Sequence, residues 1–243
     1  MRNIDSRLPL PSATVKNLSD EAAIVNASSE KKIMATKQYK AVRKLVWFRK
    51  VTETLAQMAG VGVRCMYCSG SESAQVEHYR PKATHPDLAF VWENLLWSCG
   101  ICNQIKGNRF NEDVQPVNPV DDDVWNYFFI DQFGNLSPRW NPIENSLDSR
   151  AVETIKLHAL DRQALQESRQ ERLDDLRSQA RNTLVMLESG GIGPDDLQEV
   201  VLNWIRQPFQ SDVADYFLSG PGKFDPMEPF KSLIDAMQVQ SDV

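Results

Sequence analysis

Hydrophobic residues recur at helical spacing between about Asp20 and Met58, and many of the positions between them are basic. The pattern predicts an amphipathic helical region with a break near Ser28-Ser29, ended by Gly60-Val61-Gly62. Residues 1–19 lack this periodicity and are predicted to form an extended arm. The apolar positions of the helical region include Val42, Leu45, Val46, Phe48, Leu55 and Met58.

Helical periodicity returns at Ser149 and continues towards the end of the chain. The first long helix of this part is predicted to end at Gly190-Gly191, and another is predicted from Pro194 through Trp204. Shorter helices are predicted near 211–218 and 226–237. The apolar face of the long helix consists of Leu165, Leu173, Leu176, Ala180, Leu184 and Leu187.

The segment between the two helical regions is different, because it combines short strand-like runs with turn residues. Ala74–His78 and Phe90–Trp92 are predicted as strands, and Gly100–Phe110 is predicted as a helix. Further along, Val124–Ile130 is predicted as a strand and Asp131–Asn135 as a turn.

These elements predict an α+β fold in three parts. Residues 1–60 form the arm and a basic helical region, 61–115 a small core, and 116–243 a strand and loop segment followed by a C-terminal helical region. The content of 42% hydrophobic and 25% charged residues is ordinary for a globular protein. No apolar run approaches the ~20 residues of a membrane span, and no signal-like stretch opens the sequence, so we expect a cytoplasmic protein without membrane contact.

The distribution of charge changes this picture more than its total of −6. Nine basic residues and a single acidic one lie between Lys31 and Arg64, whereas acidic residues dominate from Glu188 onward. Such asymmetry lets one part of an acidic protein attract phosphates. A solvated helix face is the alternative interpretation of the basic stretch.

Two C-x-x-C pairs, Cys65/Cys68 and Cys99/Cys102, account for every cysteine. Each C-x-x-C turn places two thiolates within reach of one ion, and two such turns complete a tetrahedral Cys₄ zinc site. Because four protein ligands leave no open position, this zinc is predicted to be structural. A thioredoxin-like redox pair is the alternative, but neither pair opens a clear βαβ unit.

The residues between and after the cysteine pairs read V-E-H-Y-R-P-K, W-E-N-L-L-W-S and C-G-I-C-N-Q-I-K-G-N-R-F. In this order they resemble the HNH nuclease family, whose ββα-metal core often lies between two zinc-binding C-x-x-C turns. The resemblance gives catalytic positions to Glu77, His78, Asn94 and Asn103. It implies that the amide of Asn94 binds loop backbone and orients His78.

The chemistry of these residues supports phosphodiester hydrolysis. A neutral imidazole such as His78 can take a proton from water near pH 7. Glu77 and Asn103 offer the oxygen ligands that Mg²⁺ prefers. Since neighbours on a regular strand point to opposite faces, we expect a twist or bulge at Glu77-His78 to turn both towards one site.

This sequence departs from the commonest form of the family at two positions. Glu77 stands where Asp is more usual, and Asn103 replaces the final His. Without that imidazole the site favours Mg²⁺, or Mn²⁺, over softer metals.

Several further side chains near the motif are candidates for substrate binding. Arg80, Lys82 and Lys106 are predicted to contact the nucleic-acid backbone, although Lys106 could instead support the fold. His85 could be an additional metal ligand, but His-Pro in a loop is more often a turn element. His158 is predicted to be a packed or capping residue.

A looser resemblance extends beyond the motif, through V-E-H-Y-R-P-K and A-V-E-T-I-K-L-H-A-L-D-R, to the HNH subunits of Septu anti-phage systems and retron-associated effectors. It implies a defence nuclease that acts with an ABC-type ATPase. The leading hypothesis is therefore a metal-dependent HNH endonuclease, with DNA favoured over RNA. The alternative is a non-catalytic zinc-ribbon-like module that binds nucleic acid or a partner.

Overall fold

The computed structural model describes residues 4, 6–60, 62–70, 74–206, 211–219 and 229–238. Its contacts divide the chain into two units. The N-terminal unit contains residues 3–122 together with 153–159, and the C-terminal unit contains residues 1–2, 123–152 and 160–243. The three-part division made from the sequence is not tested by this and stays a prediction.

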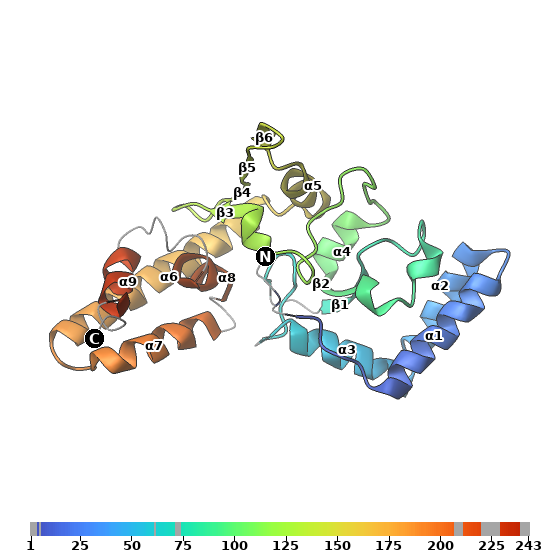
Figure 1. Cartoon of the computed structure of the whole chain (residues 1–243), viewed down its shortest axis with the longest axis horizontal. Coiled ribbons are helices and arrows are strands. Elements are labelled where there is room, and N and C mark those ends of the chain that lie inside the picture. The colour runs from blue at the N-terminus through green and yellow to red at the C-terminus, as the bar shows by residue number, and fades with distance from the viewer. Residues whose placement is uncertain are drawn as a thin grey trace. The chain divides into compact units, whose positions relative to one another are not determined.

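Three helices open the N-terminal unit: α1 (Ser12–Ala27), α2 (Lys31–Val42) and α3 (Val46–Met58) (Figure 1). The break near Ser28-Ser29 is confirmed. The extended arm was predicted too long, because α1 already begins at Ser12 and buries Leu18 and Val25. A second break, between Val42 and Val46, has no counterpart in the sequence prediction.

A two-stranded antiparallel sheet follows, formed by β1 (Ala74–His78) and β2 (Leu95–Cys99). The first strand is where the sequence predicts it. The second was placed too early, since Trp92–Asn94 forms a 3₁₀ turn and the apolar run that begins at Leu95 pairs with β1. The five residue pairs of the ladder are consecutive, from Ala74 with Cys99 to His78 with Leu95.

Helix α4 (Gly100–Lys106) continues directly from β2, and both α3 and α4 contact the two strands. The helix is shorter than predicted because Gly107 adopts a positive φ of 56° and ends it. The loop before β2 is held by Arg7, whose guanidinium donates to the carbonyl oxygens of Trp92 at 2.8 Å and Leu95 at 3.0 Å. These contacts fix the strand, and with it the start of α4.

The C-terminal unit begins with short strands. Only the second half of the predicted strand Val124–Ile130 is extended, since Val124–Asn126 forms a 3₁₀ turn. The carboxylate of Asp131 accepts from the backbone amides of Phe133 and Asn135, which confirms the predicted turn. The strands are β3 (Phe128–Ile130) with β4 (Leu136–Pro138), and β5 (Trp140–Asn141) with β6 (Ser146–Leu147).

Helices are the main elements of the remaining described residues, and one of them, α5 (Ser149–His158), contributes residues to both units. The others are α6 (Gln163–Glu188), α7 (Pro194–Arg206), α8 (Ser211–Ala214), a π-helical turn at Asp215–Ser219, and α9 (Phe230–Gln238). Residues 226–228 of the predicted last helix lie outside the described residues. Among the helices described, none has both the length and the apolar character needed to cross a bilayer.

A buried ion pair stabilises the C-terminal unit. Arg172 of α6 donates to Asp212 of α8 at 2.5 Å, and both side chains are almost completely buried. Burial alone would raise the pKa of Asp212, but the Arg172 charge opposes it and the net shift is downward. The folded carboxylate therefore stabilises this unit above the pKa of the unfolded residue, and that stability is lost as the pH falls through the lower folded pKa.

We expect Arg172→Met to lower the free energy of unfolding by about 3–5 kcal/mol, because it leaves a buried charge unpaired. The matched control is Arg181→Met, which removes an exposed arginine of the same helix and should change the free energy of unfolding by less than about 1 kcal/mol. Chemical denaturation at pH 7 measures both. Equal losses for the two variants would contradict the role given to the buried pair.

Candidate active site and metal centre

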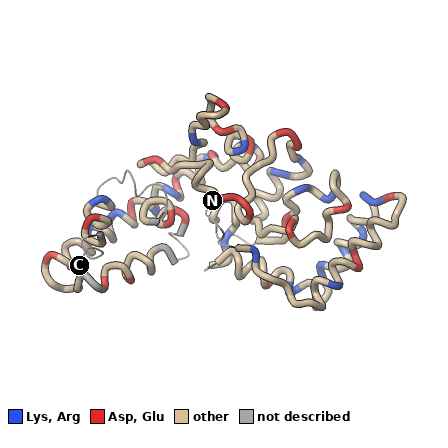
Figure 2. The backbone as a smooth tube through the Cα atoms, viewed as in Figure 1, with Lys and Arg blue, Asp and Glu red and all other residues tan. Residues whose placement is uncertain are grey.

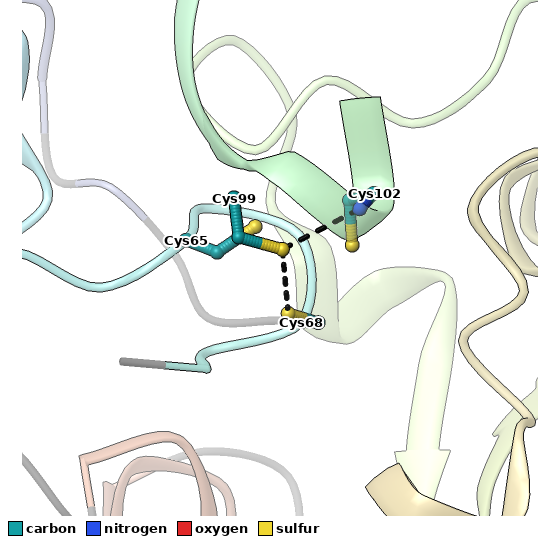
Figure 3. Close-up of side chains that lie close together, drawn as sticks. All are labelled: Cys65, Cys68, Cys99 and Cys102. Atoms are coloured by element: carbon teal, nitrogen blue, oxygen red, sulfur yellow. Dashed lines mark hydrogen bonds between the residues drawn. The ribbon is translucent and has the colours of Figure 1, made fainter. Parts of the chain in front are cut away.

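The four cysteines converge in the N-terminal unit, although 30 residues separate the two pairs (Figure 3). Cys65 and Cys68 lie on a turn before β1, Cys99 ends β2, and Cys102 lies in the first turn of α4. All four side chains are buried, and their sulfur atoms lie within 4.8 Å of one another. The junction between β2 and α4 therefore places Cys99 and Cys102 next to the first cysteine pair.

The cluster has the dimensions and donors of a tetrahedral metal site. Four sulfurs at zinc–thiolate distances are separated by about 3.8 Å, and the Sγ atoms of Cys68 and Cys99 are 3.7 Å apart. Backbone amides of Gly70 and Cys102 donate to these two sulfurs at 3.4 Å, which favours thiolates. Contact with Cys102 lowers the pKa of Cys99 to about 7. The residues thus fit a closed, four-thiolate metal centre.

A cavity of about 360 Å³ lies in the same unit and contains the predicted catalytic residues in its wall. Glu77 and His78 reach it from the end of β1, and Asn103 reaches it from α4. Every residue of β1 lines the cavity, and the strand contains no bulge. The consecutive pairing excludes a bulge at Glu77-His78. The twist that was the other expectation stays a prediction.

His78 is held as a neutral base. Its Nε2 lies 3.0 Å from the carbonyl oxygen of Ala89, and a carbonyl can only accept, so Nε2 carries the proton and Nδ1 is bare. Burial, with a smaller contribution from Lys82, lowers the pKa of His78 to about 3. The ring also packs edge-on against Tyr39, with the centroids 4.8 Å apart. The imidazole is therefore both oriented and uncharged at neutral pH.

Glu77 is the most enclosed of the three, with 2% of its surface exposed. One carboxylate oxygen, Oε1, accepts from the ammonium of Lys106, and the other accepts from the Tyr67 hydroxyl at 3.2 Å. An ionised carboxylate has about four lone-pair sites, so these two contacts leave lone pairs of Glu77 unused. The same contacts fix the direction of the carboxylate.

The two asparagines lie in different surroundings. Asn103 is half-buried in the cavity wall. Asn94 is buried and bonds the loop that follows β1. Its Oδ1 accepts from the Arg80 amide at 2.7 Å, and its Nδ2 donates to the carbonyls of Arg80 and Leu88 at 3.0 Å. These are the backbone contacts that the sequence prediction gave to Asn94. Its effect on His78 stays a prediction.

The three predicted substrate-binding cations are not equivalent. Lys82 lines the cavity, and its ammonium lies 5.0 Å from the centre of the Tyr39 ring. Arg80 pairs with Glu112 at 2.9 Å and does not line the cavity. Lys106 is 1% exposed and binds Glu77 and the carbonyl of His78. Its ammonium is thus inside the fold, which disfavours the predicted contact with the nucleic-acid backbone and agrees with the alternative that Lys106 supports the fold.

Reasoning from the sequence did not assign three residues at this site. Tyr39 and Arg43 line the cavity from α2 and its C-terminal end. Tyr67 lies within the first C-x-x-C turn, and its hydroxyl donates a hydrogen bond to Glu77. The basic helical stretch was a signal for Arg43, but no local pattern connects either tyrosine with the motif.

The remaining histidines lie apart from the cavity wall. His85 pairs with Glu112 at 2.6 Å. His158 is completely buried and stacks on the ring of Tyr67, with a centroid distance of 3.7 Å. The sequence predicts a packed or capping residue at His158, and in the structure the ring is packed. Among the described residues, the group of side chains close enough to hold a metal ion together consists of the four cysteines. Neither His85 nor His158 belongs to it.

Residues 65–109 match the family model described as HNH endonuclease. The two strands, the following helix and the four-cysteine cluster lie within this segment, and the chain therefore carries an HNH endonuclease domain. Septu protein PtuB of Bacillus thuringiensis is 38% identical over 69 residues, which are 26% of this chain and 27% of that protein. The similarity thus spans about a quarter of the length of this relative.

We expect Cys99→Ala to lose the bound metal and most of the soluble, folded protein. Three thiolates cannot close the tetrahedron, and metal binding in small domains of this kind contributes on the order of 10 kcal/mol to folding. Metal content by plasma mass spectrometry and the melting temperature measure the effect. Ser98→Ala, at the neighbouring buried position, is the control and should keep its metal. Full metal content in Cys99→Ala would refute the closed centre.

The second prediction concerns the Glu77–Lys106 pair. Lys106→Met should lower the free energy of unfolding by about 3–5 kcal/mol, because the carboxylate is left buried without its cation. Adding Glu77→Gln should recover much of this loss, since the buried charge is then removed as well. A denaturant titration of both single variants and the double variant gives the coupling energy. Additive losses would show that the two side chains do not act as a pair.

Proposed function

We propose that this protein is a metal-dependent endonuclease that hydrolyses phosphodiester bonds in nucleic acid, with DNA preferred to RNA. The observation that carries the proposal is the shared cavity: a neutral, oriented imidazole and two oxygen donors line one wall. A module that only binds nucleic acid has no need of this trio. We also propose that the four-cysteine centre holds zinc and has a structural role.

His78 is the general base of the proposed reaction. Its Nδ1 takes the proton of the attacking water, while the Nε2 hydrogen bond to Ala89 keeps the ring in the productive tautomer. Because the imidazole is neutral at pH 7, it does not have to lose a proton first. Asn94 contributes indirectly, through the loop backbone that follows the strand.

Glu77 and Asn103 are the proposed ligands of a catalytic Mg²⁺ or Mn²⁺ ion. Carboxylate and amide oxygens suit these hard cations, and such an ion stabilises the charge that develops on the phosphate. Lys106 and Tyr67 hold the Glu77 carboxylate in place. Lys82 faces the cavity and is the proposed contact to the substrate backbone. For Arg80 that role requires release from Glu112.

The setting we propose is anti-phage defence. It rests on the similarity to Septu protein PtuB, which covers a quarter of each chain. In that setting the nuclease acts with an ABC-type ATPase, and the helices outside 65–109 are the proposed docking surface. Cytoplasmic location belongs to the same proposal.

The deciding experiment is cleavage of plasmid DNA, single-stranded DNA and RNA with Mg²⁺ or Mn²⁺. We expect His78→Ala to reduce the rate at least 10²–10⁴-fold, the usual contribution of general-base catalysis, while the content of zinc stays unchanged. The control is His85→Ala, which removes a loop histidine that does not line the cavity and should cut within a few-fold of the native rate.

Equal cleavage rates for His78→Ala and the native chain would refute the role of His78 as the general base. The assay is run with and without the partner ATPase, because the complex could be the active form. A native chain that binds DNA tightly but cuts nothing in either condition would favour the zinc-ribbon-like module instead.

A further inference from the structure

Part of the cavity wall comes from outside the segment that matches the nuclease family. Tyr39 and Arg43 reach it from α2 and its C-terminal end, and Phe48 and Thr52 reach it from α3. The family match begins only at Cys65. The N-terminal helices therefore complete the pocket around His78 and can add contacts that the core alone lacks.

The charges of this cavity do not balance. Three charged side chains line it: Glu77, Arg43 and Lys82. The negative charge of Glu77 is already compensated by Lys106, which lies behind it. Within the described part of the chain, no carboxylate forms a salt bridge with Arg43 or Lys82. The cavity thus has an excess of two positive charges, which suits an anion.

The pKa of Lys82 reflects the same excess of positive charge. Burial lowers its pKa, Glu77 raises it, and the nearby charges of Arg43, Lys106 and Lys40 lower it further. Basic positions recur along α2 and α3 (Figure 2). Most of them are exposed helix positions of the kind that occur without any ligand. Arg43 is exposed as well, but unlike the others on these helices it lines the cavity that contains the proposed general base.

Local structure explains how Arg43 comes to lie there. It is one helical turn beyond Tyr39, so both residues are on the same face of the helix. The Tyr39 ring contacts His78 and lies below the ammonium of Lys82. The Arg43 amide donates to the Tyr39 carbonyl at 3.2 Å and extends the helix by one residue. Tyr39 therefore anchors the end of α2 against the active site.

We propose that Arg43 and Lys82 form a phosphate clamp that binds the nucleic-acid backbone beside His78, with Arg43 supplied by the N-terminal helices. The proposal rests on the nuclease function proposed above. The planar guanidinium of Arg43 offers a donor fork that matches two phosphate oxygens, and Lys82 contributes a point charge. Substrate binding thus extends beyond the segment that matches the nuclease family.

The test compares Arg43→Gln with Lys37→Gln. Lys37 is an exposed residue of the same helix that does not line the cavity, so both variants lose one positive charge. Binding of a fluorescein-labelled 30-base-pair DNA duplex is measured by anisotropy at several salt concentrations. A His78→Ala background keeps the DNA intact in the presence of Mg²⁺.

We expect Arg43→Gln to weaken binding by about tenfold, as for loss of one charge-assisted hydrogen-bonding group. The slope of log K against log salt should fall by about 0.9, the value for one lost phosphate contact. With intact His78, the same change should raise KM and leave kcat within a few-fold. Lys37→Gln should change neither quantity to this extent.

Arg43→Lys separates charge from geometry and is available if Arg43→Gln does not fold. It should keep the salt slope but bind several-fold more weakly, because the fork is lost. Arg43 variants that match Lys37→Gln in slope, affinity and KM would overturn the clamp. Loss of cleavage with an unchanged salt slope would overturn it too.

The outcome of this test is distinguishable from that of the nuclease test. A native chain that binds the duplex with the expected Arg43 dependence but never cuts it keeps the clamp and refutes the nuclease. A native chain that cuts DNA without any dependence on Arg43 keeps the nuclease and refutes the clamp. A chain that neither binds nor cuts nucleic acid refutes both.

Discussion

The geometry of the proposed active site depends on one buried carboxylate. Glu77 lies on β1, its cation Lys106 on α4, and its hydroxyl donor Tyr67 in the first cysteine turn. A charge buried this deeply is tolerated only when it is paired and hydrogen-bonded. The strand, the helix and the turn are therefore fixed relative to one another by the side chain that is proposed to bind the catalytic metal.

Residues whose chemistry depends on local spacing could be predicted from the sequence. The two C-x-x-C pairs converge as expected, and β1 ends at the predicted Glu77-His78. The second strand was misplaced because Phe90–Trp92 is an apolar, strand-like run. In the structure Trp92–Asn94 forms a 3₁₀ turn, and the carbonyl of Trp92 accepts from the distant Arg7. Long-range contacts of this kind leave no periodic trace in the chain.

The positively charged residues show a similar limit. Lys106, Arg80, Lys82 and Arg43 look alike in sequence, and what distinguishes them is the partner each finds after folding. Lys106 compensates a buried carboxylate and Arg80 an exposed one, whereas Lys82 and Arg43 face the cavity without a carboxylate partner in the described structure. A one-dimensional charge count cannot separate structural cations from those that are free to meet a phosphate.

The N-terminal unit also draws on residues 153–159, more than 40 positions beyond the family-matched segment. His158 stacks on Tyr67, and the carbonyl of Leu157 accepts from Arg109. Since a chain is synthesised from its N-terminus at about 5–20 residues per second, the metal ligands emerge from the ribosome seconds before these contacts exist. The order of the sequence thus delays the packing of His158 on Tyr67, whose hydroxyl holds the Glu77 carboxylate, until residues 153–159 have been made.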